Sequence, residues 1–256
     1  MEIANILPVN CINKDMLRQP YEMYLTHKVL EHPDQFAFLA EDQANSIKSF
    51  KILDNSACEL GEGMDFDKVL QAAQIIKADE IVLPDIPRSG KSLSKTLQYL
   101  SDLDKDIVHR YRIAAVCQGE TYDQVLACAE QILSIKTVKT LMLPKWYCSM
   151  ESANGLGRHR LTKEILRLIV SYDRQDVQIH WLGLDTGIRE LISPLKQYVR
   201  SVDSGYYAAL ATPQWSHLHV ASERPRELKI DLEQMDVDID RWKQLVAAAN
   251  KLIKEA

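Results

Sequence analysis

The sequence of 256 residues contains few cysteines, and their spacing excludes several kinds of site. The five thiols (Cys11, Cys58, Cys117, Cys128 and Cys148) are odd in number and never closer than eleven residues apart. This arrangement argues against a disulfide framework and against a Cys-x-x-Cys zinc or redox site. We therefore expect a reducing, cytoplasmic compartment and no metal site.

Long apolar runs are also missing. No stretch approaches the ~20 apolar residues that a membrane helix needs, and the N-terminus lacks a basic-then-apolar signal, so no membrane association is expected. The net charge of −5 disfavours a protein that coats nucleic acid by charge alone, but it leaves room for a local basic patch. With 46% hydrophobic and 26% charged residues, the composition is that of a soluble globular protein.

Short apolar runs alternate with segments of helical period along most of the chain. Eight runs are strand-like: 36–41, 50–54, 80–85, 112–117, 139–143, 177–182, 199–203 and 217–221. Helical stripes lie between most of them, with Asp123 and Thr162 at expected N-cap positions. This alternation predicts an α/β fold, a single (β/α)8 barrel of TIM type over residues 1–256. Residues 1–35 would decorate the barrel and 236–254 would form a closing helix; a doubly wound open sheet is the competing architecture.

Three of the predicted strands end in aspartate: Asp54, Asp85 and Asp203. In a barrel the C-terminal strand ends share one face, where active sites lie. Each aspartate alone is typical of a helix N-cap or a turn, but three carboxylates on one rim repel one another, which favours a functional role. Paired carboxylates at a barrel mouth suit glycosidic chemistry, with one as nucleophile and another handling the proton.

Histidine-based chemistry has no comparable pattern. The sequence has no HExxH motif and no P-loop, and no Ser-His-Asp arrangement stands out. His217 and His219 alternate on the last predicted strand, so one of them is expected to face the barrel interior as a hydrogen-bonded core residue.

Four segments resemble, in their order, the tRNA-guanine transglycosylase superfamily. They are ILDNSACELG, DEIVLPD, AAVCQG and IHWLGLDTGIRELISPLKQYVRSVDS, and the resemblance spans about Lys51 to Ala211. Its most specific part runs from Gln178 to Gly205, where the family's glycine, helix and terminal aspartate recur in order.

The resemblance implies a role for each matching residue. Asp203 would be the nucleophile and Asp54 the general acid/base. The residues that would bind the base are Asp85, Gln118, Gly119, Leu182 and Gly183. The implied reaction exchanges guanine for a free 7-deazaguanine base through a covalent glycosyl-enzyme and needs no cofactor.

The sequence departs from the tRNA enzymes of this superfamily at three places. No cysteine follows Cys148, so the zinc subdomain is expected to be absent. The segment 204–215 has no basic residue where those enzymes carry arginines, and Cys58 stands where they place an aromatic ring that stacks on the base. Stacking would then come from Trp146, Tyr147 or Tyr206.

With these departures, the sequence resembles the compact, bacteriophage-associated DNA-guanine transglycosylases of the DpdA type. Those enzymes insert preQ0 or a related base into DNA. We therefore expect a pentosyltransferase that flips its target guanine out of DNA, in the host cytoplasm if phage-encoded. Phosphate contacts are expected from Arg88, Lys145, Arg158, Arg160 and Lys163, unless these form only a solvated helix face. The alternatives are tRNA as substrate, a hydrolase, or a noncatalytic nucleic-acid-binding barrel. Dimerisation is common in the superfamily.

Overall fold

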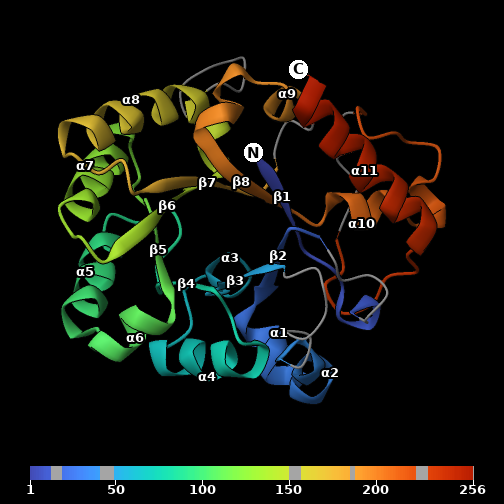
Figure 1. The fold of residues 1–256 in the computed structure, drawn as a ribbon, viewed down its shortest axis with the longest axis horizontal. Helices are drawn as coiled ribbons and strands as arrows, with labels where there is room; N and C mark the ends of the chain where they lie inside the picture. Colours follow the sequence, from blue (N-terminus) through green and yellow to red (C-terminus); the bar gives the residue numbers. More distant parts are fainter. Residues whose placement is uncertain (13–18, 41–48, 150–156, 185–187, 223–229, 256) are drawn as a thin grey trace.

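The eight strands close into a parallel barrel in chain order, with β8 pairing β1 (Figure 1). The computed structural model describes residues 1–12, 19–40, 49–149, 157–184, 188–222 and 230–255. The strands are β1 (Glu2–Asn5), β2 (Tyr21–Leu25), β3 (Phe50–Asp54), β4 (Glu80–Val82), β5 (Arg112–Val116), β6 (Val138–Pro144), β7 (Gln178–Leu182) and β8 (Val199–Ser204). The expected single (β/α)8 barrel is confirmed, and the open sheet is excluded.

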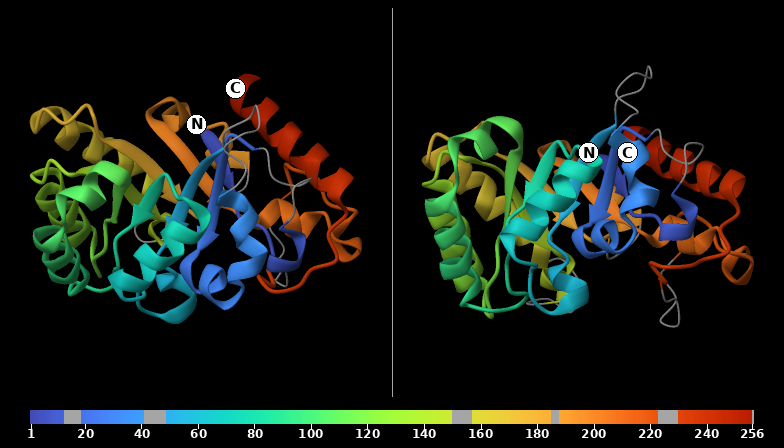
Figure 2. Two further views of the ribbon diagram at one scale, coloured as in Figure 1. Left: turned by 60° about the horizontal axis from the view of Figure 1, so that its bottom comes forward. Right: turned by 90° about the horizontal axis from the view of Figure 1, so that it is seen from below.

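Helices surround the barrel in the ring seen in Figure 1 and from the side in Figure 2. They are α1 (Thr26–Glu31), α2 (Pro33–Ala37), α3 (Ala57–Leu60), α4 (Phe66–Ile76), α5 (Ser92–Asp102), α6 (Lys105–Arg110), α7 (Tyr122–Leu133), α8 (Gly157–Ser171), α9 (Ile188–Leu191), α10 (Tyr206–Leu210) and α11 (Ile239–Glu255). Short 3-10 turns are η1 (Val9–Cys11), η2 (Phe38–Ala40), η4 (Lys145–Ser149), η5 (Pro194–Tyr198) and η6 (Pro213–Trp215). The expected C-terminal helix is α11. Within the described ranges, no helix is both long and apolar enough to cross a membrane.

The N-terminal residues are part of the barrel, so the prediction that 1–35 only decorate it is wrong. They supply β1 and β2, which complete the ring between β8 and β3. In the described part of this segment, Tyr21–Leu25 is a strand and Thr26–Glu31 is a helix. Both strands are short, and pairing on each side stabilises them more than their own propensity does.

Two of the predicted strands are not strands. Of the run 36–41, residues 36–40 lie in α2 and η2 and residue 41 lies outside the described residues; Pro33 stands at the first helical position and starts a helix that buries Phe36 against Tyr24. The run 217–221 is turn and coil. His217 and His219 are exposed there, so neither is the expected core histidine.

The buried apolar side chains form two clusters, one on each side of the barrel wall. The larger cluster joins the outer faces of the strands to the helices. The smaller cluster consists of strand residues alone, and because side chains alternate along a strand, it fills the barrel interior. Its members are Ala4, Met23, Ile52, Val82, Ala114, Val116 and Met142.

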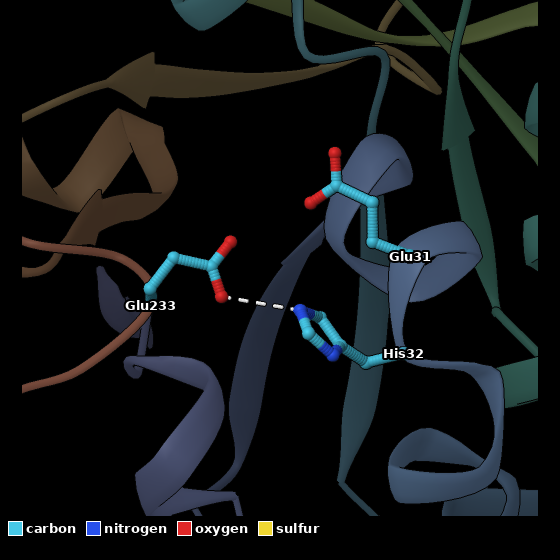
Figure 3. Close-up of side chains that lie close together, drawn as sticks. All are labelled: Glu31, His32 and Glu233. Carbon is cyan, nitrogen blue, oxygen red and sulfur yellow. Dashed lines mark hydrogen bonds and ion pairs between the residues drawn. The ribbon is translucent and has the colours of Figure 1, made fainter.

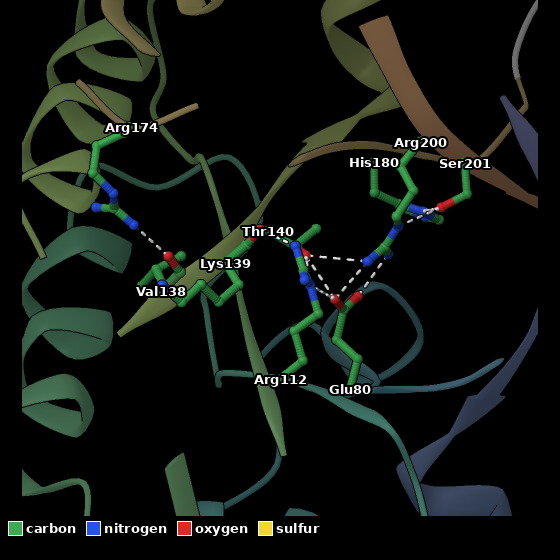
Figure 4. Close-up of polar contacts among 9 residues, drawn as sticks. All are labelled: Glu80, Arg112, Val138, Lys139, Thr140, Arg174, His180, Arg200 and Ser201. Atoms are coloured by element: carbon green, nitrogen blue, oxygen red, sulfur yellow. Dashed lines mark hydrogen bonds and ion pairs between the residues drawn. The ribbon is translucent and has the colours of Figure 1, made fainter. Parts of the chain in front are cut away.

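A charged network occupies the N-terminal end of this interior (Figure 4). The carboxylate of Glu80 accepts from both terminal nitrogens of Arg200 at 2.7 Å and from the hydroxyl of Thr140 at 2.6 Å. Arg112 Nε lies 3.1 Å from the same carboxylate. Since Glu80 has no exposed surface, its charge is compensated by these cations and not by water. The bottom of the barrel is therefore closed by ion pairs.

Candidate active site at the carboxyl-terminal mouth

The residues expected to carry the chemistry lie at or just after the C-terminal ends of successive strands. Asp54 ends β3, Asp85 follows β4, Gln118 and Gly119 follow β5, Leu182 ends β7 with Gly183 after it, and Asp203 is the last residue but one of β8. Because all the strands are parallel, these positions share one end of the barrel. That end is opposite to the network around Glu80.

Asp54 is half-buried and surrounded by other carboxylates. Its Oδ2 accepts from the backbone N–H of Ser56 at 2.8 Å. Burial raises the pKa of Asp54 well above its usual value, and the charges of Glu59, Asp85 and Asp203 raise it further. Glu59 was not predicted; it lies on α3, and burial raises its pKa as well. Asp54 therefore holds a proton more readily than an ordinary aspartate, as a general acid/base at neutral pH requires.

Asp203 is buried, and both of the hydrogen bonds described for its carboxylate are made by one oxygen, Oδ1. Oδ1 accepts from the backbone N–H of Gly183 at 2.8 Å and lies 3.1 Å from Nε2 of His180. Among the described residues, no donor is found on Oδ2. Gly183 has φ +70°, and a Cβ there would come within 2.9 Å of Lys145 Cδ, so the peptide that donates to Asp203 depends on glycine. One carboxylate oxygen is thus held and the other is left for chemistry.

His180 is the main site residue that sequence reasoning missed. It lies in β7 with no exposed surface, and its Nδ1 is 2.7 Å from Ser201 Oγ. Burial lowers the pKa of His180, so the ring is neutral near pH 7. The only available signal was the alternation of His180 with Leu182 along the strand, which points both side chains into the barrel.

Asp85 forms the centre of a buried amide–carboxylate cluster. Asn55 Nδ2 donates to one oxygen at 2.7 Å, and Gln118 Nε2 donates to the other at 2.6 Å. The backbone N–H of Arg88 donates to Gln118 Oε1 at 3.1 Å and so fixes which way that amide faces. The structure therefore brings Asp85 and Gln118 together as expected, and adds Asn55.

Gly119 and Leu182 occupy less polar positions. Gly119 is buried where a Cβ would approach Cβ of Gln124 to 2.8 Å, so a glycine lets the β5 loop pass close to α7. Leu182 is half-buried at the top of the interior cluster. Contact of Leu182 with a base stays a prediction, whereas Gly119 serves the packing of the loop in addition to any contact with a ligand.

Arg158 is a buried clamp and not the phosphate-binding residue that was expected. Its guanidinium has no exposed surface and pairs with Glu190. It also donates to the carbonyls of Leu143 at 3.2 Å, Leu182 at 2.8 Å and Gly183 at 2.9 Å. Since every one of these contacts is internal, Arg158 cannot reach a nucleic-acid backbone. It joins the ends of β6 and β7 beside Asp203.

The other four expected phosphate-binding residues are exposed: Arg88, Lys145, Arg160 and Lys163. Lys145 lies beside Gly183 at the mouth, and the guanidinium of Arg88 lies 5.5 Å from the ring centre of Trp146. Among the three aromatic residues considered for stacking, Tyr147 and Tyr206 are buried, and only Trp146 is partly exposed.

A second polar cluster lies away from the mouth (Figure 3). Glu31, His32 and Glu233 could in principle surround a metal ion. However, the ammonium of Lys28 contacts both Glu31 and Glu233, and His32 Nε2 is 3.1 Å from Glu233. The ammonium of Lys28 therefore bridges the two carboxylates, and the cluster links α1 to the segment before α11.

Comparison with known proteins supports the fold and goes no further. No model of a protein family matches the sequence, and no curated protein is significantly similar to it. Solved structures do match, among them a HpcH/HpaI aldolase/citrate lyase family protein from Burkholderia cenocepacia J2315. That match has a TM-score of 0.50 and 10% sequence identity, and it covers 79% of this chain and 86% of the other. At this identity the two chains are similar in their barrel fold alone.

Proposed function

We propose that this protein is a base-exchange pentosyltransferase that replaces guanine in DNA with a 7-deazaguanine base. The observation that carries the proposal is the convergence of Asp54, Asp85 and Asp203 at one mouth, where the charges of the other two act on Asp54. A purely structural role does not account for three carboxylates that repel one another in a partly desolvated place.

The arrangement of the two catalytic carboxylates suits a covalent mechanism. The free oxygen of Asp203 attacks C1′ of the sugar, and the bond from C1′ to N9 of guanine breaks while Asp54 gives its proton to the departing base. The incoming base then loses its N9 proton to Asp54 and attacks C1′, which breaks the ester bond to Asp203. Both carboxyl groups return to their starting states, so the exchange needs no redox partner.

Base selection is assigned to Asp85 and Gln118. A carboxylate accepts from the adjacent ring N–H and amino group of guanine, which adenine does not present in that arrangement. The Gln118 amide has its NH2 group directed at Asp85, so its second N–H is available for the guanine carbonyl oxygen. This pairing also accepts 7-deazaguanines, because the replaced ring atom lies on the opposite side of the base.

The nucleic-acid side of the proposal is supported by surface charge and by the segment after Asp203. The exposed cations Arg88 and Lys145 flank the mouth, with Trp146 beside them. The residues of α10, which follow Asp203, are all buried and contain no basic side chain. They are thus unable to read an RNA loop in the way the resemblance would require, which favours DNA.

A base-exchange assay tests this function directly. The protein is incubated with guanine-containing DNA or with tRNA, each with labelled guanine or preQ0, and nucleosides are analysed by mass spectrometry. We expect incorporation into DNA and an adduct that survives denaturing electrophoresis. Asp203→Asn should abolish both, whereas Asp173→Asn, a change at an exposed residue in the loop that enters β7 at the opposite end of the strands, should abolish neither.

Three other outcomes would contradict the proposal. Incorporation only into tRNA would make the protein an RNA-modifying enzyme. Release of free guanine without incorporation would indicate a hydrolase. Binding of nucleic acid without an adduct, equally in wild type and Asp203→Asn, would indicate a noncatalytic barrel.

A further inference from the structure

We propose that His180 is a positioning residue for Asp203: a neutral imidazole with its proton on Nε2 holds Oδ1 and directs Oδ2 to the sugar. This inference rests on the proposed function for its catalytic meaning, but its geometry is independent of that function. His180 has no exposed surface, so it does not itself touch a substrate.

The direction of each hydrogen bond follows from the chemistry of the partners. An ionised carboxylate only accepts, so Nε2, 3.1 Å from Asp203 Oδ1, carries the hydrogen. In a neutral ring Nδ1 is then an acceptor, and Ser201 Oγ at 2.7 Å must donate to it. Arg200 Nε, which can only donate, lies 3.1 Å from the same Oγ and takes one of its lone pairs. The three contacts are compatible with a single assignment of protons.

The series of hydrogen bonds that begins at Asp203 continues to the bottom of the barrel. Arg200 is held by both oxygens of Glu80, so the guanidinium cannot rotate away from Ser201 without breaking a buried ion pair. Figure 4 shows Arg200, Ser201 and His180 side by side above Glu80. We infer that this network fixes the ring of His180 from below, as buried second partners commonly fix a functional histidine.

Some of the charges around His180 raise the pKa of its ring and others lower it. Asp203 and Glu80 favour a protonated ring, whereas Arg200 and burial disfavour it, and burial is the largest effect. Arg112 lies beside Glu80 and adds a second positive charge to that end of the interior. The imidazole therefore donates to Asp203 as a neutral group and leaves the negative charge on the carboxylate.

Nuclear magnetic resonance tests the tautomer without any substrate. In protein labelled with ¹⁵N-histidine, we expect His180 to show a protonated Nε2 and an unprotonated Nδ1 from about pH 6 to pH 8. Ser201→Ala should increase the population of the Nδ1–H form. A ring that carries its proton on Nδ1 in wild type, or that titrates near the ordinary value of about 6.5, would overturn the inference.

Kinetics test the effect on Asp203. His180→Phe removes the donor, and we expect adduct formation to slow by about tenfold to hundredfold with little change in KM. The pH profile of the rate should also change, because the ring next to the reacting carboxylate no longer donates a hydrogen bond to it. His180→Gln places a donor where Nε2 was and should recover most of the rate.

The outcomes separate this inference from the proposed function. If wild type forms no adduct with DNA or tRNA, the function is wrong, and the tautomer measurement still decides the geometry. If wild type is active but His180→Phe keeps its rate and pH profile, the positioning role is wrong. If His180→Phe does not fold by circular dichroism, Ser201→Ala takes its place, and an unchanged pH profile in that variant overturns the role.

Discussion

At the scale of single residues, the three aspartates at the mouth of the barrel differ in the number of hydrogen bonds that their carboxyl groups accept. Asp85 and Asp203 each accept two hydrogen bonds, whereas Asp54 accepts one backbone N–H and faces other carboxylates. Burial and these neighbouring carboxylates therefore disfavour the ionised form of Asp54. The close carboxylates at this mouth lower the folding stability, as is common for active sites.

Replacement of Asp54 by Asn should stabilise the protein at high pH. The folded-state pKa of Asp54 is raised, so ionisation costs stability as the pH rises above the unfolded value of about 3.9. We expect Asp54→Asn to raise the free energy of unfolding by roughly 1 kcal/mol or more at pH 8, and by much less at pH 4. Urea denaturation at both pH values measures this. An equal effect of Asp54→Asn at both pH values would contradict the raised pKa of Asp54.

Arg158 should be among the residues most sensitive to truncation. Its removal leaves Glu190 buried without its cation and frees three backbone carbonyls at the ends of β6 and β7. We expect Arg158→Ala to lower the free energy of unfolding by about 3–5 kcal/mol. The exposed Arg160, two residues on, is the control, and Arg160→Ala should cost less than about 1 kcal/mol. Similar losses for both variants in urea would show that Arg158 is not a clamp.

At the scale of elements, strong periodicity was a reliable guide and short strands were not. Val69, Ala73 and Ile76 recur at helical spacing and are buried on one face of α4, and β3 has the predicted bounds 50–54. In contrast, β1 has only four residues, Glu2–Asn5. Only two of them are apolar, which is too little to predict a strand from the sequence. Its stability comes from pairing with β8 and β2, which local patterns do not record.

In the candidate site too, residues that follow a local sequence pattern were predicted, and residues whose role depends on contacts between strands were not. Asp54, Asp85 and Asp203 were found because they end apolar runs, and Gln118 because it follows one. His180 and Asn55 were missed because their roles depend on contacts between strands. Arg158 was misassigned since a basic residue near a helix start is commonly exposed, whereas this one is drawn inward by Glu190. Charge patterns predict where a helix face lies but not which cation it buries.

The start of helix α7 allows a test of which residue caps it. Asp123 was expected to cap it, but the helix begins at Tyr122, and the Thr121 hydroxyl accepts from the N–H of Gln124 at 3.3 Å. The second expected cap, Thr162, is inside α8 and donates to the carbonyl of Arg158. We expect Thr121→Ala to destabilise the protein by about 1 kcal/mol, and Asp123→Ala by about half as much through the helix dipole. Thermal denaturation compares the two, and the reverse order would restore Asp123 as the cap.

At the scale of the whole molecule, the barrel is closed by its first strand. β1 pairs with β8 along Glu2–Asn5 and with β2 on its other side. A barrel without β1 leaves the edges of both neighbours unpaired and opens the interior cluster at Ala4.

Deletion of residues 1–5 should therefore abolish cooperative unfolding. We expect the truncated protein to lose the sharp transition in urea monitored by circular dichroism, because two strand edges and the interior become exposed together. Glu2→Gln, which alters the same strand without removing it, should retain the transition. A deletion variant that unfolds like wild type would mean that these residues are only an appendage.

The seam between β1 and β8 also has a consequence for synthesis on the ribosome. The first strand emerges early, but the strand that covers its open side is made only after seven others have been translated. Until then the nascent chain carries an unprotected edge, which other chains can pair with. A chaperone that covered β1 during that interval would favour folding over pairing with other chains.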